Sequence, residues 1–135
     1  MKTNLPQVIQ FTVPGHPVAQ ARPRIVRHGK YAGMANTPEC DNYRAYFRSL
    51  ASQYRPEKLI DRACRLVVRV FVLKPKSWAK NRVHAETKPD LDNFLKMVMD
   101  SLDGIIYDND SRVVTVIALK ELSDRPRVEV EVEVL

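Results

Sequence analysis

The sequence predicts an α+β fold of two layers, in which two main helices pack on one face of a mixed β-sheet. Three observations support this prediction. Apolar segments rich in β-branched residues have the length of strands, two other segments have helical periodicity, and they follow one another in the order β-α-β-α-β-β. The chain has 135 residues, of which 44% are hydrophobic and 28% charged, so we expect a single domain over residues 1–135.

The first third of the chain predicts a strand, a basic loop and a helix. Residues 7–13 are apolar and β-branched and end at a Pro-Gly turn, which indicates a strand. Residues 17–37 have no periodicity and predict a basic loop, or a bent hairpin. Thr37 and Pro38 are an N-cap residue and a favoured first helical residue, so a helix is expected over about residues 38–54.

The middle of the chain predicts a buried strand and a second basic loop. Residues 66–73 (LVVRVFVL) are strongly β-branched, which is typical of a central, largely buried strand. Residues 74–88 contain five Lys/Arg, one Glu and the only Trp of the chain, with no usable period. We therefore interpret residues 74–88 as a loop.

The last third predicts a helix and two strands. Apolar residues at helical spacing that end at a glycine indicate an amphipathic helix over residues 90–103, with Asp92 as the cap and Asn93 as the first helical residue. Residues 113–119 predict an apolar strand. Residues 127–135 alternate valine with charged residues, which indicates a half-exposed antiparallel strand with valine inward.

Composition excludes several classes of protein. No apolar run approaches the ~20 residues that cross a bilayer, and the first residues lack the apolar core of a signal peptide, so we expect a cytoplasmic protein that is neither membrane-spanning nor secreted. Cys40 and Cys64 have no second ligand at a suitable spacing, which argues against structural zinc and favours reduced thiols. The three histidines, His16, His28 and His84, are scattered and receive no catalytic role.

The charge is unevenly distributed along the chain. The net charge is +6, but residues 1–89 carry 17 Lys/Arg against 5 Asp/Glu, whereas residues 90–135 carry 5 against 11. This pattern suggests a polyanionic partner together with a local need for carboxylates. A solvated surface with no partner is the alternative.

The acidic residues of the last third suggest a metal site. Asp90 and Asp92 stand two residues apart before a helix, Lys96 lies one helical turn beyond Asp92, and Asp110 precedes the next strand. Three gathered carboxylates repel one another unless a cation joins them, and hard oxygen ligands suit Mg²⁺. Such a site can activate water for hydrolysis of a phosphodiester. It requires that the loop before the strand return Asp110 to the start of the helix.

Each of these residues also has a structural explanation. An Asp before a helix is often only a cap, and Asp-Asn-Asp after a glycine is often only a turn. Lys96 lies four residues from both Asp92 and Asp100, the spacing of a surface ion pair on a helix.

The two basic loops predict contacts with nucleic-acid phosphates. Trp78 and Tyr31 lie among the cations, where they can stack on splayed bases or anchor their loops to the core. The alternative for both loops is simple solvation. The predicted phosphate-binding cations are Arg22, Arg24, Arg27, Lys30, Lys74, Lys76, Lys80, Arg82 and Lys88.

Five features occur in order between about residue 8 and residue 121. They are P-G-H-P-V-A-Q-A-R-P-R (14–24), Y-A-G-M-A-N-T-P (31–38), K-P-D-L-D-N-F-L-K (88–96), G-I-I-Y-D-N-D-S-R-V-V (104–114) and Lys120. Together they resemble the RusA family of Holliday-junction resolvases, with D-L-D-N-x-x-K followed by G-x-x-x-x-x-D as the specific part. The resemblance implies a RusA-like fold and a homodimeric, Mg²⁺-dependent crossover junction endodeoxyribonuclease of DNA recombination and repair.

The resemblance also implies roles for individual residues. The acidic metal-binding positions fall on Asp90, Asp92 and Asp110, the essential lysine on Lys96, and the motif asparagine on Asn93, which we group with the DNA-binding residues. Mn²⁺ is expected to substitute for Mg²⁺, and no small-molecule cofactor is expected. Such an enzyme would be cytoplasmic and nucleoid-associated, encoded by a bacterium or a phage, and its two active sites would nick two strands of a four-way junction symmetrically.

The sequence departs from the family pattern at two places. Where the family often has Asp-Asp before Ser-Gln, this chain has Asn109-Asp110 before Ser111-Arg112, so Asp108 is an alternative third ligand and Arg112 has no assigned role. Two other functions stay open at this point. One is a branched-DNA-binding protein without catalysis, and the other is a metal-dependent nuclease that acts on other branched substrates or on RNA.

Overall fold

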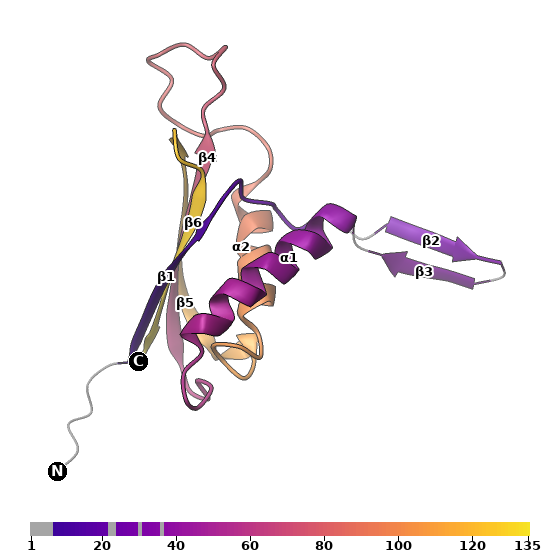
Figure 1. Cartoon of the computed structure of the whole chain (residues 1–135), viewed down its shortest axis with the longest axis vertical. Coiled ribbons are helices and arrows are strands. Elements are labelled where there is room, and N and C mark those ends of the chain that lie inside the picture. Colours follow the sequence, from indigo (N-terminus) through magenta and orange to yellow (C-terminus); the bar gives the residue numbers. More distant parts are fainter. Residues whose placement is uncertain (1–6, 22–23, 30, 36) are drawn as a thin grey trace.

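The protein folds as two layers, a four-stranded mixed sheet and two helices on one of its faces (Figure 1). The structure is a computed structural model and describes residues 7–21, 24–29, 31–35 and 37–135. The predicted α+β class is confirmed. The elements are β1 (Val8–Pro14), β2 (Arg24–His28), β3 (Tyr31–Ala35), α1 (Pro38–Ala51), η1 (Ser52–Tyr54), β4 (Cys64–Leu73), α2 (Leu91–Leu102), η2 (Asp110–Arg112), β5 (Val113–Ser123) and β6 (Arg127–Val134).

The strand order in the sheet is β1-β6-β4-β5. β4 pairs parallel with β5 and antiparallel with β6, and β6 pairs antiparallel with β1. The prediction of a central buried strand is confirmed, because Leu66, Val68 and Val70 of β4 are fully buried. β1 and β5 are therefore the two edges of the sheet.

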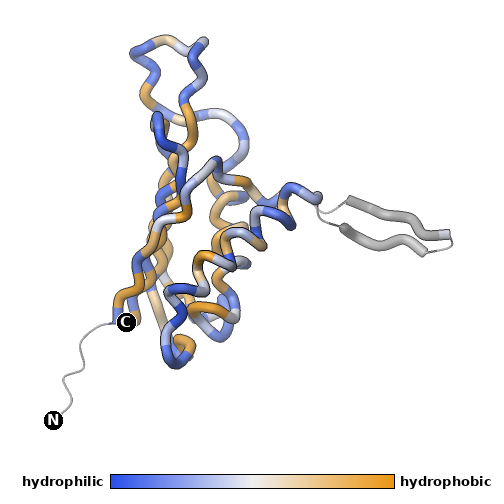
Figure 2. The backbone as a smooth tube through the Cα atoms, in the orientation of Figure 1, coloured by the Kyte–Doolittle hydropathy of each residue, from blue (hydrophilic) through white to orange (hydrophobic). Residues whose placement is uncertain are grey.

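One face of the sheet forms the core and the other carries polar side chains. The alternation in β6 works as predicted, since Val128, Val130 and Val132 are buried. The hydropathy colouring in Figure 2 shows hydrophobic residues concentrated along the strands. Because only one face is covered by helices, the charged residues of β6 stay in contact with water.

Helix α1 begins where its capping signal predicts. The Thr37 Oγ1 accepts a hydrogen bond from the Cys40 amide at 3.2 Å, and Pro38 is the first helical residue. Tyr43 and Phe47 are buried against the sheet, where Phe47 contacts Phe11 edge-on. The α-helix ends at Ala51 and continues as the single 3₁₀ turn η1, so the two elements together cover the predicted residues 38–54.

One prediction about the elements is confirmed and another needs correction. The hairpin alternative for the first basic segment is confirmed, since β2 and β3 pair antiparallel and add two strands to the predicted order. Helix α2 begins at Leu91 instead of Asn93, because the Asp90 carbonyl already accepts hydrogen bonds from the Asn93 and Phe94 amides at 3.2 and 3.3 Å. Asp90 thus occupies the N-cap position, and Asp92 lies in the first turn.

Both cysteines are buried free thiols, as expected. None of the helices in the described part of the chain is long and apolar enough to cross a membrane.

Candidate active site

Asp90 and Asp92 lie together at the start of α2, and both are exposed. Although Asp90 stands at the N-cap position, its carboxylate makes no capping hydrogen bond within the described structure. The side chain is 53% exposed, and its Oδ2 lies 3.5 Å from the ammonium of Lys88. A helix start is a favourable place for anions, but this carboxylate remains available to a ligand.

A side chain of the sheet holds the residues just before Asp90 in place. The Lys120 ammonium on β5 donates hydrogen bonds to the backbone carbonyls of Thr87 at 2.6 Å and Pro89 at 2.8 Å. The Gln20 backbone amide donates a hydrogen bond to the Asn93 backbone carbonyl at 2.9 Å. This contact brings the chain that leads into the first basic segment to the same end of α2. The start of α2 is therefore held by two elements that are distant in sequence.

Lys96 lies one turn beyond Asp92, as the spacing predicts, but its ammonium pairs with Asp100. The distance from Lys96 Nζ to Asp100 Oδ2 is 3.7 Å, and the lysine side chain is 64% exposed. An exposed ion pair at this spacing contributes little stability, so Lys96 can exchange Asp100 for a phosphate at low cost.

Asp110 lies near the opposite end of α2. It is the first residue of η2, directly before β5. Asp103 is the residue that follows the last turn of α2, and the pKa of its carboxyl is raised first by burial and then by the charge of Asp110. The 12 residues of α2 span about 18 Å. Among the described residues, no three His, Cys, Asp or Glu side chains form a group suited to a metal ion. One chain thus does not bring Asp110 to Asp90 and Asp92.

The second basic loop, residues 74–88, lies beside Asp90. It leaves the sheet at the end of β4 and returns directly into the start of α2 (Figure 1). Inside it, the Lys74 ammonium donates to the Lys80 carbonyl at 3.1 Å, and the Arg82 guanidinium stacks on the Trp78 ring at 3.7 Å. Of the predicted cations of this loop, Lys88 lies at the carboxylates, whereas Lys74, Lys76 and Arg82 line a separate hollow together with Leu122, Ser123 and Asp124.

The first basic segment is only partly described. Arg22 and Lys30 lie outside the described residues. Arg24 and Arg27 belong to β2 and Tyr31 to β3, but the structure describes the backbone alone for these three.

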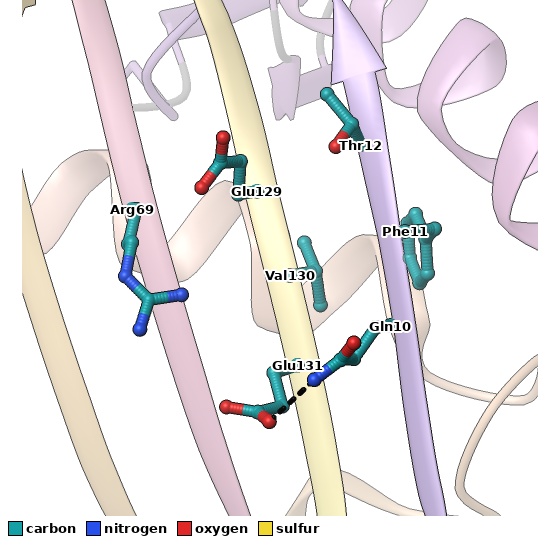
Figure 3. A pocket seen from close by; sticks show the side chains of 7 residues that line it. All are labelled: Gln10, Phe11, Thr12, Arg69, Glu129, Val130 and Glu131. Atoms are coloured by element: carbon teal, nitrogen blue, oxygen red, sulfur yellow. Dashed lines mark hydrogen bonds between the residues drawn. The ribbon is translucent and has the colours of Figure 1, made fainter.

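A hollow on the open face of the sheet has no link to the predicted site. It measures about 300 Å³ and is lined by side chains of β1, β4 and β6 (Figure 3). Gln10 donates to Glu131 at 2.7 Å, and Arg69 lies among the acidic residues there. No predicted metal-binding or DNA-binding residue lines it.

Comparison with known proteins identifies the family of the chain. Residues 14–133 match the family described as endodeoxyribonuclease RusA. The chain belongs to the RusA family. It is also 40% identical over 133 residues to "Uncharacterized protein YqaN" of Bacillus subtilis (strain 168), a match that covers 90% of this chain and 93% of that protein. Membership makes the chain an endodeoxyribonuclease, and RusA-family nucleases generally depend on a divalent metal and bind branched DNA.

The two departures from the RusA pattern have local structural roles. Arg112 donates to both carboxylate oxygens of Asp108, at 2.8 and 3.1 Å, and this pairing lowers the pKa of Asp108. The Asn109 side chain accepts a hydrogen bond from the Ser111 amide at 2.8 Å and caps η2. Asp108 is thus already engaged by a guanidinium, which favours Asp110 over Asp108 as the third ligand.

Sequence reasoning gave Lys120 no role beyond its match to the RusA motif. The signal that points to it is a cation in an otherwise apolar strand segment, V-V-T-V-I-A-L-K. Only the fold shows which carbonyls its ammonium contacts.

Proposed function

We propose that this chain is a structure-selective endonuclease that resolves Holliday junctions by symmetric nicking of two strands, with Mg²⁺ as cofactor and Mn²⁺ as a substitute. The observation that carries the proposal is the exposed carboxylate of Asp90. It makes no capping hydrogen bond within the described structure, and it lies next to both Asp92 and the 74–88 loop. Carboxylates that face a cationic surface provide metal ligands and phosphate contacts in one place. Membership in the RusA family supports the same reaction.

We further propose that each metal site is completed by two copies of the chain. Asp90 and Asp92 of one protomer would join Asp110 of the partner subunit, since α2 separates these residues within a single chain. All three donors are carboxylates, the hard oxygen ligands that Mg²⁺ and Mn²⁺ prefer. Two such sites related by a two-fold axis suit a substrate with two equivalent strands.

The exposed edge of β5 supports this arrangement. β5 has 11 residues, forms one edge of the sheet, and exposes the large apolar side chains of Val114, Val116 and Ile117. The uncovered residues 114–117 invite pairing with a second strand, whereas Glu121 near the end of β5 is already bridged by His84 of the 74–88 loop. An antiparallel pair centred on residues 114–117, with the two strands about 4.8 Å apart, would direct the start of one strand toward the end of the other. Asp110 of the partner subunit would then approach Lys120, and with it Pro89 and Asp90.

The chain's own residues would then divide the work. Asp90 and Asp92 would hold the metal, which supplies Lewis-acid activation of water and of the phosphate. Lys96 would leave Asp100 and neutralise charge that develops on the phosphate in the transition state. The cations of the 74–88 loop would bind the flanking backbone.

Subunit complementation tests this function and the shared site together. Asp90→Asn and Asp110→Asn should each abolish cleavage of a four-way junction in Mg²⁺ while keeping junction binding. Heterodimers of the two variants, purified through two different tags, would contain one intact site and should nick one strand per junction. Wild-type protein with EDTA, and linear duplex as substrate, are the controls.

The other outcomes identify the competing functions. If heterodimers stay inactive while wild type cuts, each site lies within one chain and the shared site is wrong. Tight junction binding without cleavage in any divalent metal would indicate a DNA-binding protein without catalysis. Equal cleavage of flaps, forks or RNA would make the chain a nuclease of other substrates.

A further inference from the structure

A cleft of about 200 Å³ lies between the 74–88 loop and the first turn of α2. We call it the Trp78 cleft. Its apolar lining comes from Val72, Leu73, Pro75, Trp78, Pro89, Phe94 and Leu122. Lys88 and Lys120 also line it, and the Lys88 side chain is 87% exposed and contacts Asp90. The cleft therefore combines an apolar interior with a cation that reaches the proposed catalytic carboxylates.

A second cleft, of about 620 Å³, borders the other side of the same loop. It shares Leu73 and Leu122 with the first, and it adds Lys74, Lys76 and Arg82. Trp78 lines the first cleft and Arg82 the second, and the two side chains stack at 3.7 Å. The stacked pair thus stands where the two clefts meet, with a phosphate-binding surface on one side and an aromatic wall on the other.

The loop is already ordered around this pair. The Trp78 amide donates to the Pro75 carbonyl and the Arg82 amide to the Ala79 carbonyl, both at 3.1 Å. A bridge between His84 and Glu121 ties the loop to β5. These contacts lie within the protein, so they hold the loop in the conformation that forms the cleft.

We infer that the Trp78 cleft receives one unstacked nucleobase, next to the scissile phosphate that would lie at Asp90 and Asp92. This inference rests on the proposed function. Aromatic walls bind bases through stacking without requiring a particular base, and a guanidinium on the far face of the ring adds a cation–π contact. The neighbouring cations favour a polyanionic DNA strand over a neutral or basic occupant, since the 74–88 loop has five Lys/Arg and one Glu.

The position of Pro89 explains why the bound base would flank the cut. This residue lines the cleft and directly precedes Asp90, so base and scissile phosphate would belong to the same or adjacent nucleotides. A branch point lowers the cost of taking a base out of its stack, because its pairs are already strained or open. The Trp78 cleft would therefore contribute to selection of branched over linear DNA.

A chemical double-mutant cycle tests this inference. Single-turnover cleavage by wild type and Trp78→Leu is measured on a normal junction and on junctions with one abasic nucleotide beside the cut. Trp78→Leu should slow cleavage of the normal junction about tenfold and cleavage of the correctly placed abasic junction less than about twofold. Trp78→Phe, which keeps an aromatic wall, should restore most of the rate.

Matched controls separate a base contact from a folding defect. Tyr46→Leu removes an exposed aromatic side chain of α1 outside the loop and should cut both junctions like wild type. Thermal melting must show that Trp78→Leu is folded. If Trp78→Leu loses the same factor on normal and abasic junctions at every position, Trp78 contacts no flanking base and the inference fails.

A binding measurement distinguishes this failure from failure of the proposed function. Trp78 is the only tryptophan, so its emission reports on this cleft alone. In EDTA, the normal junction should quench the emission more strongly than the abasic junction does. If wild type never cuts a junction, the proposed function fails, yet this titration still decides the inference. Equal quenching by both junctions would overturn it.

Discussion

The Lys120 ammonium donates a hydrogen bond to the Pro89 carbonyl at 2.8 Å, one residue before Asp90. A second hydrogen bond, to the Thr87 carbonyl, has a length of 2.6 Å. Lys120 belongs to β5 and Asp90 to the start of α2, so this side chain joins the sheet to the candidate site. Charged donors make stronger hydrogen bonds than neutral ones, which makes Lys120 a positioning residue for the carboxylate.

Replacing Lys120 with methionine should therefore impair cleavage more than binding. We expect the cleavage rate of Lys120→Met to fall by about tenfold or more, because a small displacement of Asp90 misaligns the reacting groups. The free energy of unfolding should fall by about 1–3 kcal/mol, since two carbonyls lose their donor. Single-turnover kinetics, junction binding and urea unfolding measure the three effects.

Lys120→Arg should recover part of the rate, because a guanidinium also donates to carbonyls. A junction affinity reduced in parallel with the rate would instead place Lys120 in the DNA-binding surface. Unchanged kinetics in Lys120→Met would show that Asp90 does not need this support.

The exposed cations of the 74–88 loop should determine the salt dependence of DNA binding. Lys76→Ala should lower the slope of log Kd against log salt by about 0.9 if the ammonium contacts one phosphate. Lys58→Ala is the control, because Lys58 is also exposed, pairs with Asp61 at 3.2 Å, and precedes the opposite end of β4. Equal slopes for wild type and Lys76→Ala would make Lys76 a solvated residue.

Local patterns in the sequence were sufficient to predict most of the fold. The Val/Glu alternation of β6 and the β-branched run of β4 report burial directly, since one or both faces of a strand meet the core. The start of α2 was misplaced because two aspartates two residues apart are both acceptable caps. The hydrogen bonds that the Asp90 carbonyl accepts from the Asn93 and Phe94 amides decide between them.

The site was predictable only in parts. The chemistry of Asp90, Asp92 and Lys96 follows from residue types and spacing, and their grouping with the basic loop follows from chain proximity. The location of Asp110 does not, because a six-residue connection can return to either end of a helix. The support from Lys120 depends on the parallel pairing of β4 and β5, which brings the end of β5 to the start of α2. Such contacts between distant segments leave little trace in one sequence.

Asp103 should make stability depend on pH. Burial, followed by the charges of Asp110 and Asp100, raises the pKa of its carboxyl above the ordinary value of 3.8. The folded chain therefore binds more protons at this position than the unfolded chain, and the resulting stabilisation is present below 3.8 and is lost as the pH rises through the raised pKa.

Asp103→Asn removes this titration. The free energy of unfolding of the variant relative to wild type should rise with pH across that window and level off above it. Urea unfolding from about pH 3 to about pH 7 measures the difference. Parallel curves for the two proteins would show that Asp103 titrates alike in the folded and unfolded chains.

Charge placed on the β5 edge should separate the proposed dimer. Val116 is 38% exposed near the middle of β5, so two copies would lie close to the two-fold axis of an antiparallel β5 pair. In Val116→Lys the like charges would repel one another across the strands. Light scattering should show a monomer, and cleavage should be lost while the melting temperature of the fold changes little.

Two further variants make this experiment specific. Val8→Lys places the same charge on the other edge strand, β1, at a side chain 46% exposed, and should remain dimeric and active. Mixing Val116→Lys with Val116→Glu would set opposite charges across the proposed interface and should restore dimers and part of the cleavage. If Val116→Lys stays dimeric and active, the protomers associate through another surface. Asp110 of the partner subunit would then have to meet Asp90 across that other interface.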